Sequence, residues 1–128
     1  MRVLDGEQVL LRIFIGEADR HGRQPLYRAL VDLLRREGLA GATVLRGVLG
    51  FGAKSHLHSA HLLRLSQDLP MVIEVVDTQE NLDRVLPEID RMVGEGLITL
   101  EKVRVIRYAP APPAGQDPAG DADARQGP

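Results

Sequence analysis

The 128-residue sequence predicts an α+β domain in which the elements follow the order strand, helix, strand, strand, helix, strand. Two observations lead to this class. Four segments are rich in Val, Leu and Ile or alternate apolar with polar side chains, and two others carry apolar side chains at helical spacing. The order is that of the ferredoxin-like βαββαβ fold, in which two helices cover one face of a four-stranded antiparallel sheet.

The first predicted strand covers residues 8–16, and its two faces differ. One face is wholly apolar and carries Val9, Leu11, Ile13 and Ile15. On the other face, Leu10 and Phe14 flank Arg12. Because the helices of a two-layer domain cover only one face of the sheet, we expect the second face to meet a partner. Symmetric self-association is the commonest form of such contact.

The first helix is predicted to follow a polar, glycine-containing loop at residues 17–24. Pro25 suits the first turn of a helix, where its missing N–H group is no loss. Gly38 is typical of the position just after a helix. The apolar side chains between them recur at helical spacing and are Leu26, Ala29, Leu30, Leu33 and Leu34.

A long polar segment separates the second and third predicted strands, residues 42–49 and 69–76. The first of these is rich in Val, Leu and Thr, which suit a pleated surface. Gly50-Phe51-Gly52 follows it and leads into the 53–68 loop. Such long connections in compact domains are usually functional or disordered, so we expect this loop to be the working part.

The second helix is predicted to begin at a pair that resembles a capping box, Asp77 and Glu80. Its apolar stripe contains Leu82, Val85, Leu86, Ile89, Met92 and Val93. Pro87 interrupts the pattern, which predicts a kink or a restart of the helix near Leu86.

The last predicted strand, residues 97–108, changes its alternation near Glu101 and Lys102, which suggests a bulge or a bend. We expect residues 1–108 to form one domain. Of the 20 residues from 109 to 128, 14 are Pro, Ala or Gly, and none carries a large apolar side chain. Such a segment cannot bury enough surface to offset its ordering entropy, so it is predicted to be a disordered tail.

Composition excludes several classes of function. The chain has 16 basic and 18 acidic side chains, so no basic field indicates a nucleic-acid partner. Without cysteine there is no disulfide, no thiol catalysis and no cysteine metal site. No apolar run approaches the roughly 20 residues of a membrane span, and no signal peptide is apparent, so we expect a cytoplasmic protein.

No set of residues indicates catalysis. The loop serines lack a nucleophile elbow, and there is no P-loop and no acid/base pair of carboxylates in a recognisable motif. We therefore expect a binding protein and not an enzyme.

Three histidines of the loop, His56, His58 and His61, are candidate metal ligands. On a strand, His56 and His58 would point to the same side and could share a metal ion. Their spacing does not match a known zinc signature, and solvated surface histidines remain the alternative.

Residues 41–54 (GATVLRGVLGFGAK) resemble the PII signalling superfamily. Residues 13–108 are more closely similar to an uncharacterised PII-like family, a domain of unknown function. The stretches that carry this likeness are RIFIGEAD, PLYRALVDLLRREGLAGATVLRGVLGFGA, LLRLSQDLPMVIEVVD and GLITLEKVRVIRY. The resemblance implies a homotrimer of ferredoxin-like subunits that binds ATP, ADP or AMP in intersubunit clefts and signals to a partner through a long loop.

The resemblance also implies which residues bind the ligand. The turn whose backbone approaches the nucleotide is matched by Gly50, Phe51 and Gly52, followed by Ala53 and Lys54; Arg104 and Arg107 lie in the region of phosphate-binding arginines. Two features of PII proteins are absent, namely the loop tyrosine that is modified and the glycine-rich segment with a phosphate-binding lysine before the last strand.

The partners and the alternative function follow from resemblance as well. The family's gene neighbourhood, which often includes fluoride-exporter channels, implies a membrane transporter or channel as the regulated partner. A CutA-like trimer that binds divalent metal through His56, His58 and His61 is the alternative.

Overall fold

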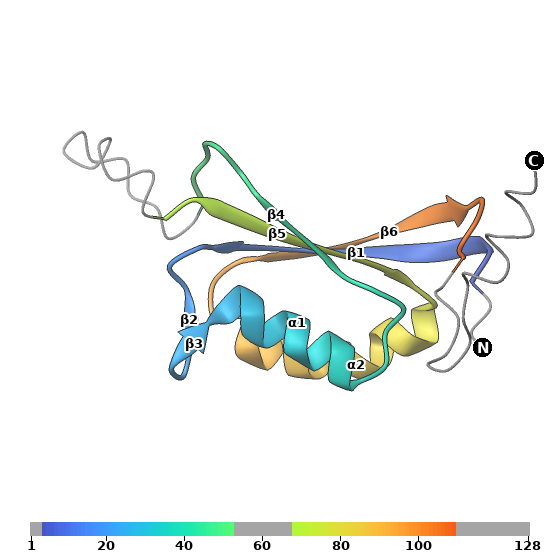
Figure 1. The fold of residues 1–128 in the computed structure, drawn as a ribbon, viewed down its shortest axis with the longest axis horizontal. Coiled ribbons are helices and arrows are strands. Elements are labelled where there is room, and N and C mark those ends of the chain that lie inside the picture. The colour runs from blue at the N-terminus through green and yellow to red at the C-terminus, as the bar shows by residue number, and fades with distance from the viewer. Residues whose placement is uncertain (1–3, 53–67, 110–128) are drawn as a thin grey trace, which may run out of the picture.

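The computed structural model describes residues 4–52 and 68–109, and their elements are shown in Figure 1. The elements are β1 (Gly6–Gly16), β2 (Arg20–His21), β3 (Gln24–Pro25), α1 (Leu26–Arg36), β4 (Thr43–Arg46), β5 (Pro70–Asp77), α2 (Gln79–Met92) and β6 (Leu97–Val105). Neither helix is long and apolar enough to cross a membrane.

Four strands form one antiparallel sheet in the order β4-β5-β1-β6. Both helices lie against the same face of this sheet (Figure 1). This order and layering are those of the ferredoxin-like fold, so the predicted fold class is confirmed. The opposite face of the sheet is called the open face below.

The core lies between the sheet and the two helices. Its most buried side chains include Leu11 and Ile13 of β1, Leu30 of α1, and Leu82 and Ile89 of α2, all with 0% exposure. These are the apolar positions that the periodicities of 2.0 and 3.6 residues selected in strands and helices. The alternation of β1 therefore determines which face receives the helices.

The start and end of α1 follow from local chemistry. Pro25 precedes the helix as its N-cap residue and belongs to a two-stranded hairpin, β2–β3, that the sequence did not predict. Gly38 has φ +78°, and the Leu39 N–H donates to the Leu34 carbonyl at 3.0 Å. This is the glycine-terminated helix end that was predicted.

The predicted cap of α2 is wrong by one residue. Thr78 is the N-cap, since its hydroxyl accepts a hydrogen bond from the Asn81 N–H at 3.1 Å. Asp77 is instead fully buried and accepts hydrogen bonds from the Ala40 N–H and the Asn81 side chain, both at 2.8 Å. The helix also continues through Pro87, so no restart occurs. Pro87 is exposed, and the buried side chains on either side hold the helix together.

Of the bulge or bend predicted in β6, the bulge is wrong, because pairing with β1 is continuous from Leu97 opposite Phe14 to Val105 opposite Gly6. The change in alternation has another cause. Lys102 stands on the helix side by register, yet its side chain is 79% exposed. The helices do not cover this end of the edge strand, so its apolar side chains shift to the open face. β4 is also shorter than predicted and ends at Arg46.

The open face carries an apolar row across all four strands. Register places Leu45, Val72, Phe14 and Leu97 side by side, and we call these four residues the apolar row. Leu45 is 47% and Leu97 55% exposed, so the row is open to solvent in the single chain.

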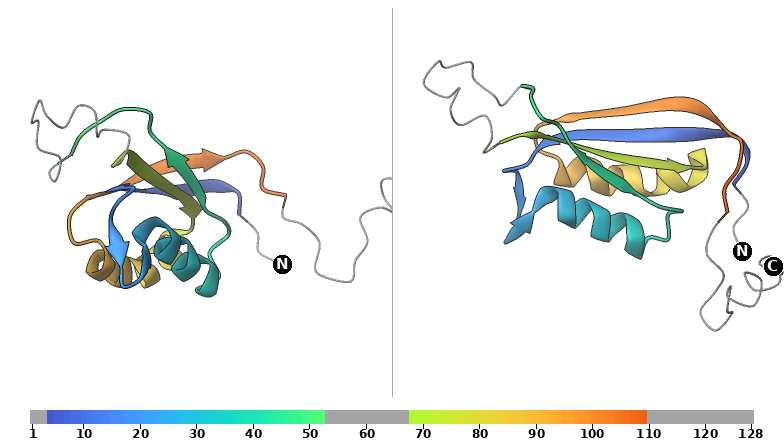
Figure 2. Two further views of the ribbon diagram at one scale, coloured as in Figure 1. Left: turned by 60° about the vertical axis from the view of Figure 1, so that its left-hand side comes forward. Right: turned by 45° about the horizontal axis from the view of Figure 1, so that its top comes forward.

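The other end of the open face differs from the prediction, because Leu10 is only 8% exposed. It lines a hollow together with Leu4 and Tyr108, which lie before β1 and after β6. The Tyr108 hydroxyl donates a hydrogen bond to the Ala40 carbonyl at 3.3 Å. β1 begins and β6 ends at this end of the sheet, opposite to the start of β5 (Figure 2).

Candidate functional site

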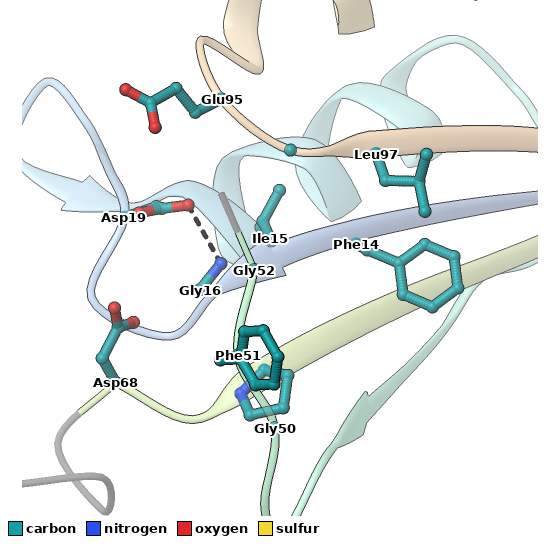
Figure 3. A pocket seen from close by; sticks show the side chains of 12 residues that line it. Phe14, Ile15, Gly16, Asp19, Gly50, Phe51, Gly52, Asp68, Glu95 and Leu97 are labelled. Carbon is teal, nitrogen blue, oxygen red and sulfur yellow. Dashed lines mark hydrogen bonds between the residues drawn. The ribbon is translucent and has the colours of Figure 1, made fainter. Parts of the chain in front are cut away.

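A cavity of about 360 Å³ lies at the end of the sheet where β1 finishes. It is lined by the last residues of β1, by residues 50–52, by Asp68 and Pro70 at the start of β5, and by residues 95–97 before β6 (Figure 3). These segments are distant in sequence and meet only in the folded sheet. The volume falls within the range of small-molecule sites, roughly 300–1,000 Å³.

The three predicted residues Gly50, Phe51 and Gly52 all line this cavity. Phe51 is 70% exposed, so its ring is available to another molecule. A Cβ atom at Gly50 would lie 3.1 Å from Pro70 Cγ, so packing within the chain already favours glycine there. At Gly52 a Cβ atom would meet nothing within 4 Å among the described residues, and φ is not positive. Neither steric packing nor backbone conformation in the described chain therefore requires glycine at position 52.

Two further glycines that the sequence did not single out as site residues also line the cavity. A Cβ atom at Gly96 would lie 2.6 Å from the Phe14 carbonyl oxygen, and one at Gly16 would collide with Asp68 Oδ1. Both positions allow a close approach of segments around the cavity. The signal in the sequence was weak, because single glycines at strand ends are common.

Two aspartates hold the β1–β2 turn beside the cavity. Asp19 is 7% exposed, and its Oδ2 accepts a hydrogen bond from the Gly16 N–H at 2.9 Å. Asp68 Oδ1 accepts one from the Ala18 N–H at 3.1 Å. The Asp19 bond lies within the turn, and the Asp68 bond ties the turn to the start of β5.

Among the described residues, the charged side chains that line the cavity are all negative. Asp19, Asp68 and Glu95 contribute carboxylates, and no lysine or arginine within residues 4–52 and 68–109 lines it. In Figure 3 the carboxylates lie on one side of the view, and Phe14 and Leu97 lie on the other. The cavity therefore combines an apolar side with an acidic side.

The predicted phosphate-binding arginines lie far from this cavity within one chain. In the strand register Arg104 stands opposite Glu7 of β1. Glu7 is nine positions before Gly16, so Arg104 is roughly 30 Å from the cavity end of β1. Arg107 lines the hollow of about 470 Å³ at the same far end as Leu10. Either arginine could reach the cavity residues only from a neighbouring subunit.

Arg12 and Arg46, which lie among apolar residues in β1 and β4, both form ion pairs with carboxylates. Arg12 Nε lies 2.8 Å from Glu74 Oε2, and Arg12 Nη1 lies 2.9 Å from Glu101 Oε1, on the open face. The hydrogen bond with Glu74 raises the pKa of Arg12, which keeps it charged. Arg46 pairs instead with Glu17, at 2.6 Å.

The remaining predicted site residues lie outside the described residues. These are Ala53, Lys54, His56, His58 and His61. Their roles toward a nucleotide or a metal ion stay predictions. Within the described part of the chain, no group of three or more His, Asp or Glu side chains could hold a metal ion.

Relatives in sequence belong to one family. Residues 8–105 match the model of the DUF190 family, described as an uncharacterized ACR. A UPF0166 protein from Aquifex aeolicus is 40% identical over 106 residues, which cover 83% of this chain and 98% of that protein. Another from Methanocaldococcus jannaschii is 35% identical over 99 residues, with 77% and 91% covered.

Solved structures that are similar to this chain are PII-like. CPII from Thiomonas intermedia K12, bound to ADP, AMP and acetate, matches with a TM-score of 0.57 and 19% identity, over 82% of this chain and 94% of CPII. The same protein bound to ADP, AMP and bicarbonate is called a nitrogen regulatory PII-like protein and matches with a TM-score of 0.56 and 17% identity, over 80% and 97%. At this identity the likeness establishes the fold. The family match and the two relatives identify the chain as a member of the uncharacterised DUF190 family.

Proposed function

We propose that this protein is a PII-like regulatory protein that binds an adenine nucleotide, such as ATP, ADP or AMP, in a cleft between subunits. The observation that carries the proposal is the cavity at the end of β1. It is lined by Phe51 and Gly52, which precede the 53–68 loop, and by Asp68, the last residue of this loop. A ligand in the cavity therefore contacts both ends of the loop and can alter its conformation. The loop would then signal the bound state to a partner.

The choice of an adenine nucleotide is supported by CPII, a protein of similar fold that is described with ADP and AMP bound. The size of the cavity suits part of such a ligand. The identity of the partner, a membrane transporter or channel, follows from the family resemblance alone. A role in binding and regulation, without catalysis, agrees with the lack of catalytic motifs in the sequence.

A homotrimer is part of this proposal, because the open face leaves the apolar row exposed. Packing three such faces around a threefold axis removes the row from water and brings the ends of neighbouring sheets together. A neighbour can then supply cations that the described residues of one chain do not bring to the cavity. Arg104 and Arg107, which are exposed at the far end of the sheet, are candidates for this contribution.

Calorimetric titration with ATP, ADP, AMP and cyclic AMP tests the proposal, at protein concentrations well above micromolar. Saturable heat with at least one nucleotide is expected. The variant Gly52→Ala should weaken this binding without lowering thermal stability, because its Cβ meets no described atom within 4 Å.

The control is Asp90→Ala. Asp90 is exposed on α2, in the helix layer, and lines neither the cavity nor the hollow that contains Arg107. This control should bind nucleotide as the parental protein does. Absence of heat with all four nucleotides would refute the proposed function.

A further inference from the structure

We infer that residues 110–128, called the acidic segment below, dock on the cationic end of β6 in the same subunit. The cationic end of β6 consists of three exposed side chains, Lys102, Arg104 and Arg107. The attraction is one of opposite charge. The contact itself is independent of the proposed function, whereas its consequence for nucleotide binding rests on that function.

The cationic end of β6 is poorly neutralised by residues 4–52 and 68–109. Lys102 Nζ lies 3.9 Å from Glu7 Oε1, and the two side chains are 79% and 73% exposed. An ion pair this long and this exposed is weak. Arg104 and Arg107 form no ion pair within the described residues. The surface therefore carries positive charge that these residues leave largely uncompensated.

The fold keeps these cations accessible. By register, Lys102 and Arg104 stand on the helix side of the sheet, opposite Val9 and Glu7. The end of β6 extends beyond both helices (Figure 1), and both side chains are exposed. Arg107 follows the strand and lines the hollow of about 470 Å³. A segment that lies around the end of β6 can therefore reach all three cations.

The acidic segment has the complementary charge. It contains three aspartates, Asp117, Asp121 and Asp123, and one cation, Arg125. When these four are taken from the 16 basic and 18 acidic side chains, equal numbers remain, so the whole formal charge of −2 lies in this segment. The segment has no large apolar side chain, so charge is its main means of binding.

The place of the segment in the chain favours contact within one subunit. Asp117 follows Arg107 by ten positions, and Asp123 follows it by sixteen. A tether of this length holds the aspartates near β6 at an effective concentration in roughly the millimolar range. Weak charge pairs are then sufficient for frequent contact, and no single fixed conformation is required.

Docking has a consequence for the proposed nucleotide site. Arg104 and Arg107 are the arginines proposed to neutralise phosphates in the cleft between subunits. Aspartates that occupy them compete with the phosphates, so the acidic segment lowers the apparent affinity for nucleotide. The apparent dissociation constant rises by the reciprocal of the fraction of time that the arginines are free.

A nitroxide label attached to Ala122→Cys tests the contact, because the chain contains no other cysteine. The label stands between two of the aspartates and broadens the NMR signals of backbone amides that it approaches. The amides of Lys102, Arg104 and Arg107 should be broadened at about 10 mM salt, where the Debye length is about 30 Å. Most of this broadening should disappear at about 1 M salt, where the length is about 3 Å.

A neutral segment supplies the reference, because the tether alone brings the label near β6 part of the time. In the full-length variant with Asp117→Asn, Asp121→Asn and Asp123→Asn, broadening should fall to the level seen at high salt. Equal broadening with the acidic and the neutral segment would overturn the inference.

Two variants of the folded domain test the other side of the contact. Arg104→Gln should reduce the broadening at Lys102 and Arg107. Arg28→Gln removes an exposed cation of α1 and is the matched control, so it should leave the broadening unchanged. In a mixed sample, isotope-labelled subunits without nitroxide should keep sharp signals beside nitroxide-carrying subunits. Broadening of their β6 amides would place the segment on a neighbouring subunit and contradict contact within one chain.

Calorimetric titration with AMP tests the consequence in the neutral full-length variant. If the aspartates occupy the arginines half of the time, this variant should bind AMP about twofold more tightly than the parental protein at low salt. Equal affinities would overturn the competition. If neither protein binds any adenine nucleotide, the proposed function fails, and the broadening still decides whether the contact exists.

Discussion

Replacing Phe14 by alanine should weaken self-association through the open face. Phe14 lies in the apolar row between Val72 and Leu97 and is already half-buried in the single chain. Burying the remainder of its ring contributes about 1.5 kcal/mol per subunit, the lower end of the range for complete burial. Three copies in a homotrimer contribute about 4.5 kcal/mol, which corresponds to about three decades in the trimer dissociation constant.

The dissociation constant of a trimer varies with the square of the protein concentration, so the midpoint of dissociation should rise roughly 30-fold in Phe14→Ala. Sedimentation equilibrium over a dilution series measures this shift. The parental protein should have three times the 14.0 kDa mass of the chain. Phe14→Leu keeps most of the apolar surface and should change the midpoint little. A monomeric parental protein, or an unchanged midpoint in Phe14→Ala, would refute the reasoning.

Leu45→Glu tests the same interface without altering the cavity. Leu45 belongs to the apolar row and is 47% exposed, and it does not line the cavity. Association would bury an unpaired carboxylate there, which is strongly unfavourable. This variant should therefore sediment as a monomer with an unchanged circular dichroism spectrum, and a persistent trimer would exclude β4 from the interface.

Three further predictions concern the fold around the site. Asp77 is fully buried and its carboxylate accepts hydrogen bonds from Ala40, Thr78 and Asn81, so Asp77→Ala should lower the free energy of unfolding by about 3 kcal/mol in urea at constant protein concentration; a loss below about 1 kcal/mol would contradict this. Gly96→Ala places a Cβ atom 2.6 Å from the Phe14 carbonyl oxygen and should lower the Tm by several degrees, whereas an unchanged Tm would argue against this close approach. The hydrogen bond and charge of Arg91 lower the pKa of Glu88, so the pair stabilises the fold above the ordinary carboxyl pKa and this contribution is lost as pH falls through the lowered value. Arg91→Ala should accordingly raise the pKa of Glu88 in an NMR titration, and a constant pKa would disprove the interaction.

The ends of elements show where local chemistry is sufficient and where it fails. Gly38 was predicted correctly because its positive φ is a property of the backbone at that residue. Asp77 was assigned to a cap because its side chain is a good N-cap type, but the folded chain turns it inward to meet Ala40. That contact joins residues 37 positions apart, and no local pattern contains it.

The bulge predicted in β6 has a similar explanation. The periodicity of residues 97–105 reports which face is buried, and the sequence cannot tell a bulge from a change in what covers the strand. The exposed side chain of Lys102 shows that what covers the strand changes at this point. The short hairpin β2–β3 escaped prediction because two residues per strand carry no periodic signal.

The sequence by itself determined the order of the elements, the face of β1 that joins the core, and the presence of Gly50-Phe51-Gly52 at the start of the long loop. These follow from side-chain periodicity and backbone preference, which act over a few residues. Only the tertiary structure decided that Gly16, Gly96 and three carboxylates meet this turn around one cavity. It also decided that Arg104 and Arg107 lie at the opposite end, because antiparallel pairing along β1 separates the two ends of β6 by the full length of the sheet.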